Sequence, residues 1–428
     1  MRSLCIRNVR TVDTNRDGIC DIFMQEGRIA AIGTAIAATA DIEIDGTGLT
    51  AMPGLFDMHV HFRDPGQTHK EDLQSGTAAA LAGGVTGVLC MPNTAPPMDN
   101  ADTVREFLSR AAHCGIHVYQ TGCLTQNMQG KALADYDALQ TAGVTALSDD
   151  GRPVADTALM EQAMIQAAER GIPVVSHCED LNIINGGIIN QGEISVRLGV
   201  KGMDRTSEDS ITAREIALAK KNHVPIHICH VSTRGSMDAI RRAKAEGVAV
   251  TCETAPHYFM LTDEKLLSRD ANYRMNPPLR TADDVKAMIE GILDGTVDCI
   301  ITDHAPHAPH EKADFIKAPN GVVGLETSLA ATLTALYHTG LVSLQHIVAM
   351  MYNRPRNILH LPAAGIAEGA AADLILVDTE KEWVVDPAKL HSKSHNTAFQ
   401  GMTLKGKNQM TIVGGVIRYA DDRFAAYL

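Results

Sequence analysis

Residues 54–62 read GLFDMHVHF, a short apolar strand that ends in two histidines. Similar stretches recur along the chain, and segments with the helical spacing of apolar residues lie between them. They are VTGVLCMPN (85–93), IHVYQTGCL (116–124), VTALSDD (144–150), IPVVSHCED (172–180), PIHICHVS (225–232), VAVTCETAPH (248–257) and DCIITDHAPH (298–307). Eight strands that alternate with helices indicate a parallel sheet that closes. The sequence therefore predicts an α/β fold, a (β/α)₈ TIM-type barrel over residues 51–364.

The two ends of the chain depart from this pattern. Residues 1–50 and 366–428 read as short strands with turns, and neither end has enough apolar residues for a core of its own. A barrel takes roughly 250 residues, so the chain has room for one further small domain. We expect a discontinuous β-sandwich domain formed by residues 1–50 and 365–428.

Composition restricts the class of partner. The formal net charge of −13 argues against nucleic acid or an anionic membrane, and it means that an anionic substrate needs a local cationic group. The nine cysteines form no CxxC pair, which predicts buried reduced thiols. No apolar stretch reaches about 18 residues and no secretion signal is recognisable, so we expect a cytoplasmic protein without a membrane span.

Polar residues gather at the C-terminal ends of the predicted strands, which is the rim where barrel enzymes carry their chemistry. Polar residues also mark any change from strand to loop, but five strands that end in His or Asp fit that alternative poorly. The rim set is His59, His61, Asn93, Asp149, Asp150, His177, His230, His257, Asp303 and His307.

The rim set predicts a binuclear metal site. Asp57, His59, His61 and Arg63 alternate at period two and so share one strand face, although an HxH pair alone indicates a metal only weakly. We expect one ion at His59, His61, Asp150 and Asp303, and a second ion at Asp150, His177 and His230. These ligands favour Zn²⁺, two per subunit, with one ion or Co, Mn or Fe as alternatives.

Two ions would supply a hydroxide near neutral pH and polarise a carbonyl group. Asp303 is suited to take the proton during the attack and to pass it to the leaving nitrogen.

Several motifs follow one another along the whole chain: HVHFRDPG (59–66), MPNT (91–94), SDDG (148–151), SHCED (176–180), CHVST (229–233), NPPLR (276–280), DHAPH (303–307) and GAAADLILVD (369–378). With them the chain resembles the long bacterial dihydroorotases of the amidohydrolase superfamily. The resemblance implies reversible cyclisation of N-carbamoyl-L-aspartate to L-dihydroorotate plus water, in de novo pyrimidine (UMP) biosynthesis.

The predicted substrate contacts begin with Arg63, which suits a carboxylate, although a salt bridge to Asp57 or Asp64 is an alternative. The resemblance implies further contacts from His61, Asn93, Asn276 and His307. Residues 308–323 are polar and irregular, and we expect a lid there whose backbone at Asn320, Gly321 and Val322 touches the bound ring.

Strand four separates related families. Hydantoinases and many allantoinases bridge their ions with a carbamylated lysine there, whereas GVTALSDDG (143–151) contains no lysine. The alternation of side chains along a strand puts Asp149 and Asp150 on opposite faces but does not say which one bridges the ions. The resemblance selects Asp150. Two departures are His257-Tyr258, where the family usually has two histidines, and Asn320-Gly321, where many relatives have Phe-Gly.

The alternatives are another cyclic-amide hydrolase, such as a hydantoinase or allantoinase, and a non-catalytic dihydroorotase-like scaffold for aspartate carbamoyltransferase. The absent lysine and Arg63 argue against the first, and the complete ligand set argues against the second. The resemblance to this family implies a homodimer. It also allows a complex of the active enzyme with aspartate carbamoyltransferase.

Overall fold

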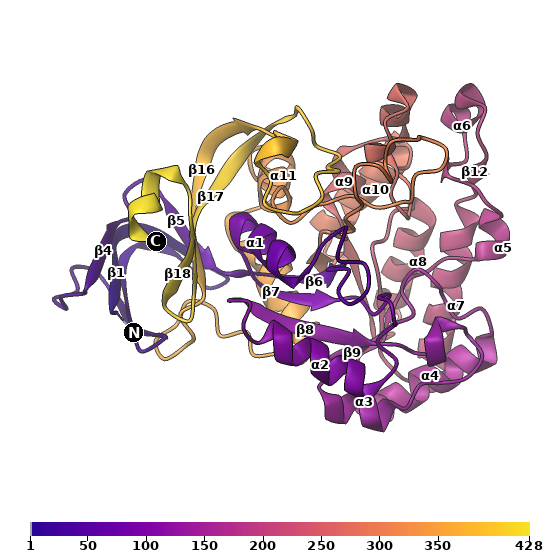
Figure 1. Cartoon of the computed structure of the whole chain (residues 1–428), viewed down its shortest axis with the longest axis horizontal. Helices are drawn as coiled ribbons and strands as arrows, with labels where there is room; N and C mark the ends of the chain where they lie inside the picture. Colours follow the sequence, from indigo (N-terminus) through magenta and orange to yellow (C-terminus); the bar gives the residue numbers. More distant parts are fainter. Residues whose placement is uncertain (1) are drawn as a thin grey trace.

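The computed structural model describes residues 2–428 (Figure 1). All the barrel strands expected from the sequence are present: β6 (Leu55–Val60), β7 (Val85–Cys90), β8 (His117–Gly122), β9 (Ala146–Leu147), β10 (Val175–Ser176), β13 (Ile226–Ile228), β14 (Val250–Thr254) and β15 (Cys299–Ile300). They form two parallel sheets, β6-β7-β8-β9 and β10-β13-β14-β15. Single parallel bridges, Leu147 to Val174 and Val60 to His304, join the sheets at their two seams. The strands therefore make one ring, which confirms the predicted barrel class.

Helices surround this ring (Figure 1). A separate two-stranded parallel sheet, β11 (Ile189–Asn190) with β12 (Gly202–Met203), lies outside it. The helices are α1 (Leu73–Gly83), α2 (Ala101–Ala111), α3 (Tyr136–Ala142), α4 (Thr157–Glu169), α5 (Leu181–Ile184), α6 (Glu193–Leu198), α7 (Thr206–Asn222), α8 (Arg234–Ala245), α9 (Pro256–Met260), α10 (Ala282–Leu293), α11 (Ser328–Thr332), α12 (Leu344–Val348) and α13 (Arg354–Ile358).

Capping side chains set where the helices begin. The Asp156 side chain accepts from the amides of Ala158 and Leu159, and α4 begins at the next residue, Thr157. At α2 the cap is the side chain of Asn100, and Asp102 lies in the first turn, where its negative charge suits the helix dipole.

The two ends of the chain share one sheet, seen at the left of Figure 1 with both termini. Its strands are β1 (Leu4–Asp13), β2 (Arg16–Gln25), β3 (Arg28–Gly33), β4 (Ile42–Asp45), β5 (Thr50–Pro53), β16 (Leu374–Val384), β17 (Thr403–Val413) and β18 (Val416–Ala420). Strand β5 joins the two ends, since it pairs with β1 on one side and β16 on the other. Strand β5 continues past residue 50 to Pro53. We propose that the β-domain and the barrel divide at residues 50 and 365.

One apolar core fills the barrel and includes Ile375 and Val377 of β16, while Leu374 and Leu376 of the same strand belong to a second core within the terminal sheet. The cysteines are free thiols, buried except for the half-buried Cys114, as the sequence predicts. None of the helices in residues 2–428 combines the length and the apolar character of a membrane span.

Candidate metal and substrate site

The C-terminal ends of the barrel strands surround a cavity of about 200 Å³. Its walls contain all the predicted substrate contacts except Val322, together with most of the predicted metal ligands. The lining residues are His61, Arg63, Asn93, Asp150, Gly151, His177, His230, Asn276, Asp303, Ala305, His307, Asn320 and Gly321. His59 lies beneath them and is fully buried.

The first predicted group of ligands converges in space. His59 Nε2 lies 3.5 Å from Asp150 Oδ1 and 3.7 Å from Asp303 Oδ1. His61 Nε2 lies 3.6 Å from Asp150 Oδ2 and 3.1 Å from Asp303 Oδ1. The ligand atoms of His59, His61 and Asp150 lie within 4.8 Å of one another, close enough to hold one ion.

The second predicted group shares a carboxylate with the first. Asp150 Oδ1 lies 3.3 Å from His177 Nδ1 and 3.7 Å from His230 Nε2, and these two ring nitrogens are 2.9 Å apart. Asp150 therefore stands between the two groups, as a bridging ligand does. Asp149 faces elsewhere: it accepts from the amides of Leu124 and Thr125 after β8.

The residues fit a cation. His59 Nε2 and Asp150 Oδ1 are buried side-chain atoms without a hydrogen-bond partner among the described residues, and they lie 3.5 Å apart. A buried polar atom without a partner costs about 1–3 kcal/mol, which a divalent ion at this point would offset. Imidazole nitrogens with carboxylate oxygens are a donor set that zinc and similar ions prefer.

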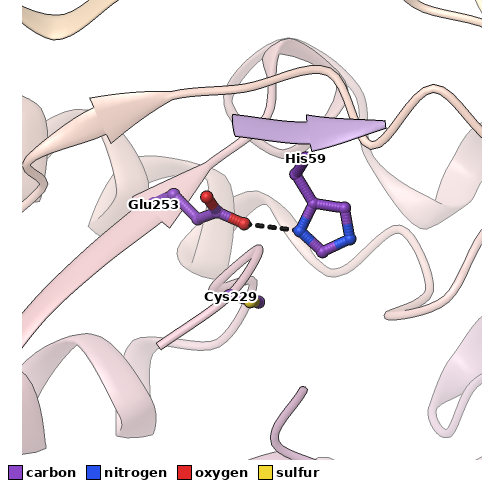
Figure 2. Close-up of side chains that lie close together, drawn as sticks. All are labelled: His59, Cys229 and Glu253. Atoms are coloured by element: carbon purple, nitrogen blue, oxygen red, sulfur yellow. Dashed lines mark hydrogen bonds and ion pairs between the residues drawn. The ribbon is translucent and has the colours of Figure 1, made fainter. Parts of the chain in front are cut away.

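Three of the histidines are held through the ring nitrogen that faces away from Asp150. Asn93 Oδ1 lies 2.8 Å from His61 Nδ1, and Glu179 Oε2 lies 3.3 Å from His177 Nε2. Glu253 Oε1 lies 2.7 Å from His59 Nδ1 (Figure 2). Such partners fix the orientation of the ring and leave the opposite nitrogen free for the metal.

Sequence reasoning missed Glu179 and Glu253. Glu179 follows His177 at period two in SHCED, and this spacing could have suggested it. Glu253 has no such signal, because its partner His59 comes from a strand 194 residues away. Cys229 lies near His59 and Glu253 in Figure 2, but burial raises the pKa of its thiol well above its ordinary value, so it is a poor ligand.

Several rim residues leave the regular strand conformation. The φ angles of Arg63, His230 and Asp303 are 59°, 32° and 48°, a left-handed region that costs a non-glycine residue about 1–3 kcal/mol. Such strain gathers at functional sites. Here it marks the points where the chain turns out of the barrel wall beside the cavity.

Arg63 has no carboxylate partner among residues 2–428, although it is only 8% exposed. Its Nε donates to Pro306 O at 3.2 Å, and burial lowers the pKa of the guanidinium to about 10. The alternative salt bridges are absent there, since Asp64 pairs with Arg110 at 2.8 Å and Asp57 accepts from Thr302. The cavity thus presents a buried cation that has no carboxylate partner in the part of the chain that the structure describes.

His307 lies beside Arg63 as a neutral ring. Burial, together with Arg63, Lys70 and Lys312, lowers the pKa of His307 to about 2. Its Nε2–H donates to Asn320 O at 2.8 Å, which leaves Nδ1 as the acceptor facing Lys70 Nζ at 3.4 Å.

The segment after DHAPH is tied to the barrel. Lys312 Nζ donates to the carbonyl oxygens of Arg274, Pro319 and Gly321 at 2.9–3.1 Å. Gly321 has a φ of 137°, and a Cβ there would lie 2.6 Å from Ala305 O. Only glycine fits this position. The backbone of Val322 is turned to the strand side, where its carbonyl accepts from Ala305 N at 2.8 Å.

Two more side chains have buried atoms without a hydrogen-bond partner in residues 2–428, His257 Nε2 and Asn276 Oδ1. Asn276 lines the cavity, so its free oxygen is available to a ligand. His257 packs edge-on against Tyr258 with ring centroids 4.2 Å apart, and burial lowers its pKa to about 4.

Proteins similar to this chain in sequence include dihydroorotases that match it over nearly its whole length. The family model described as "Dihydro-orotase-like" matches residues 48–236. The chain is 46% identical to a dihydroorotase of Geobacter metallireducens over 97% of this chain and 99% of that protein. It is 43% identical to a dihydroorotase of Syntrophus aciditrophicus over 98% and 100%.

Solved structures with a similar fold are more distant in sequence. L-Hydantoinase (dihydropyrimidinase) of Arthrobacter aurescens superimposes with a TM-score of 0.88 at 25% identity, over 97% of this chain and 96% of that one. Dihydropyrimidinase of Brevibacillus agri gives a TM-score of 0.86 at 22% identity, over 97% and 94%.

Proposed function

This chain belongs to the dihydroorotase family, and we propose that it carries out the dihydroorotase reaction at two metal ions bound on the rim of its barrel. It is a cyclic amidohydrolase that interconverts N-carbamoyl-L-aspartate and L-dihydroorotate in pyrimidine biosynthesis. The observation that supports this assignment best is Arg63, a buried guanidinium without a carboxylate partner in residues 2–428, which lines the same cavity as the metal ligands. Both of these substrates carry a carboxylate that such a group would bind.

The proposed metal ligands are His59, His61, Asp150 and Asp303 for one ion and Asp150, His177 and His230 for the other. We propose Zn²⁺ at both positions on the basis of the imidazole and carboxylate donors. Bound divalent ions would bring the pKa of a coordinated water to about 7 and polarise the amide carbonyl.

Arg63 would bind the substrate carboxylate through its planar fork, since its guanidinium finds no carboxylate partner among residues 2–428. Asn93, Asn276 and His307 would meet the polar groups of the ring without adding net charge. Gly321 would contribute its backbone, and His61 would touch the substrate as well as an ion. Val322 does not line the cavity, and its carbonyl accepts from Ala305 N instead.

Asp303 is the proposed proton carrier. Burial would raise the pKa of its carboxyl group, but His61 and His59 lower it, so the group starts ionised. In the hydrolytic direction, water adds to the amide carbon, Asp303 accepts the proton, the C–N bond breaks, and Asp303 returns the proton to the leaving nitrogen. The reverse sequence closes the ring and releases water.

The nearest alternative is a hydantoinase or allantoinase activity, because hydantoinases have the same fold. The resemblance puts Asp150 in the place of the strand-four lysine of hydantoinases and many allantoinases, and neither hydantoin nor allantoin carries a carboxylate for Arg63 to bind. A scaffold without activity would not need the six converged ligands.

The decisive experiment counts metals in the purified protein and follows N-carbamoyl-L-aspartate and L-dihydroorotate in both directions, with hydantoin and allantoin as competing substrates. We expect two zinc ions per chain and interconversion of the first pair alone. A metal-loaded protein that leaves both compounds unchanged would overturn the proposal. We further propose that the protein is cytoplasmic and forms a homodimer. Measurement of its molecular mass in solution, with and without aspartate carbamoyltransferase, tests the oligomeric state and the complex.

A further inference from the structure

Glu253 lies at the end of β14 with no exposed surface and makes contacts with two of the proposed metal ligands. Its Oε1 is 2.7 Å from His59 Nδ1 and 3.3 Å from the backbone N of His230. His59 belongs to the first group of ligands and His230 to the second. One carboxylate therefore contacts a ligand from each group.

The contact with His59 fixes which nitrogen of that ring carries the proton. Nδ1 must donate to Glu253, so the lone pair of His59 lies on Nε2 and faces Asp150 at 3.5 Å. The contact with His230 acts on its backbone, which has the strained φ of 32°. By accepting from this amide, Glu253 stabilises the turn that aims the His230 ring at Asp150.

His227 holds Glu253 in this orientation. Its Nε2 lies 3.1 Å from Glu253 Oε2, and its Nδ1 lies 2.8 Å from Thr251 Oγ1. All of these side chains are buried or bonded within the barrel, so Glu253 cannot turn away without losing several contacts.

We propose that Glu253 is a positioning residue that sets the affinity of both ion positions, and that His227 supports it from the opposite side. This inference rests on the proposed metal-dependent function. A separate third ion at His59, Cys229 and Glu253 is the competing interpretation, since these atoms also lie within 4.8 Å of one another. It requires His59 Nδ1 to be free of a proton, which conflicts with its short contact to a carboxylate.

The test is titration of the metal-free protein with Zn²⁺ alone, for wild type and Glu253→Gln. Glutamine keeps the size and an acceptor oxygen but removes the charge. We expect binding to weaken about 10- to 100-fold, the usual effect of losing such a partner. Turnover by Glu253→Gln should fall at limiting zinc and recover partly with excess zinc, while KM stays within about twofold.

The matched control is Glu215→Gln, another buried glutamate of the barrel. Glu215 pairs with Arg214 and touches none of the proposed ligands, and burial raises its pKa, so the neutral glutamine suits its position. It should bind zinc as the wild type does. His227→Gln provides a second variant, with an expected loss smaller than that of Glu253→Gln.

A folded Glu253→Gln with unchanged zinc affinity would overturn the inference, as would equal losses in the Glu215→Gln control. If Glu253→Gln does not fold, His227→Gln decides, and wild-type zinc affinity in that variant counts against the inference. Three zinc ions per wild-type chain, with one lost on Cys229→Ser, would favour the third site instead. A wild type that binds no zinc overturns the proposed function itself, an outcome distinct from all of these.

Discussion

The side chains of Arg63 and His307 lie side by side in the wall of the rim cavity, with Arg63 Nη2 3.5 Å from His307 Nε2. A protonated His307 would place two cations in contact. Its neutral state is what allows the guanidinium to remain there without a carboxylate partner in the described chain. The pair presents one positive charge and one polar ring, which suits a substrate with a carboxylate beside an amide.

Replacement of Arg63 by Lys should weaken substrate binding more than it slows turnover. Lysine keeps the charge but loses the planar fork, and hydrogen bonds to charged groups contribute about 1.5–3 kcal/mol. We expect KM to rise about 10- to 100-fold. Arg110→Lys is the control, because Arg110 pairs with Asp64 outside the cavity. Steady-state kinetics of both variants checks this, and an unchanged KM in Arg63→Lys would contradict the role.

His307 should make the metal-free protein less stable in acid. Its folded pKa is about 2, against about 6.5 for an unfolded histidine, so its contribution is complete above pH 6.5 and is lost as the pH falls toward 2. Each pH unit in this window costs at most about 1.4 kcal/mol. In denaturant titrations at pH 7 and pH 5, wild type should lose up to about 2 kcal/mol more than His307→Gln. Equal losses would show that His307 does not titrate in this way.

Asn396 ties the substrate wall to the segment between β16 and β17. Its Oδ1 accepts from His307 N at 3.2 Å, and its Nδ2 donates to Gly321 O at 3.0 Å. We expect Asn396→Ala to raise KM about tenfold with zinc content unchanged, because each hydrogen bond contributes about 0.5–1.5 kcal/mol. Asn408→Ala is a control, since this buried amide donates to the carbonyl oxygens of Leu81 and Ala82 and does not line the cavity. Similar KM values in the two variants would argue against a specific role for Asn396.

The barrel and the ligand set could be predicted from the sequence for one physical reason. Strands of a parallel barrel end at one rim, so polar residues that follow short apolar runs must approach one another. His59 and Asp303 lie far apart in the sequence yet are neighbours in space on this argument alone. The same argument could not choose between Asp149 and Asp150. The structure orients only Asp150 toward the ligands, while Asp149 caps the turn after β8.

Two supporting residues, Glu253 and Asn396, were not predictable in this way. Glu253 lies inside the barrel, where its partners come from β6 and β13 and no local spacing links them. Asn396 reaches the site from the connection between β16 and β17 of the terminal sheet, so only the packing of that connection on the barrel reveals it. The end of the terminal sheet was also hard to locate, because β5 and β6 are both buried and nearly continuous.

Asp303→Ala should separate metal binding from proton transfer. The first ion would keep His59, His61 and Asp150, whose ligand atoms lie within 4.8 Å of one another without Asp303. Removing the proton carrier costs a general acid–base step about 10²- to 10⁴-fold. We therefore expect metal analysis to show most of the zinc retained while kcat falls by that factor in both directions. Asp303→Asn should behave alike, because an amide keeps a metal-binding oxygen but accepts no proton. Full activity in either variant would refute the role of Asp303 in proton transfer. Loss of zinc in both variants would show that Asp303 acts mainly as a metal ligand.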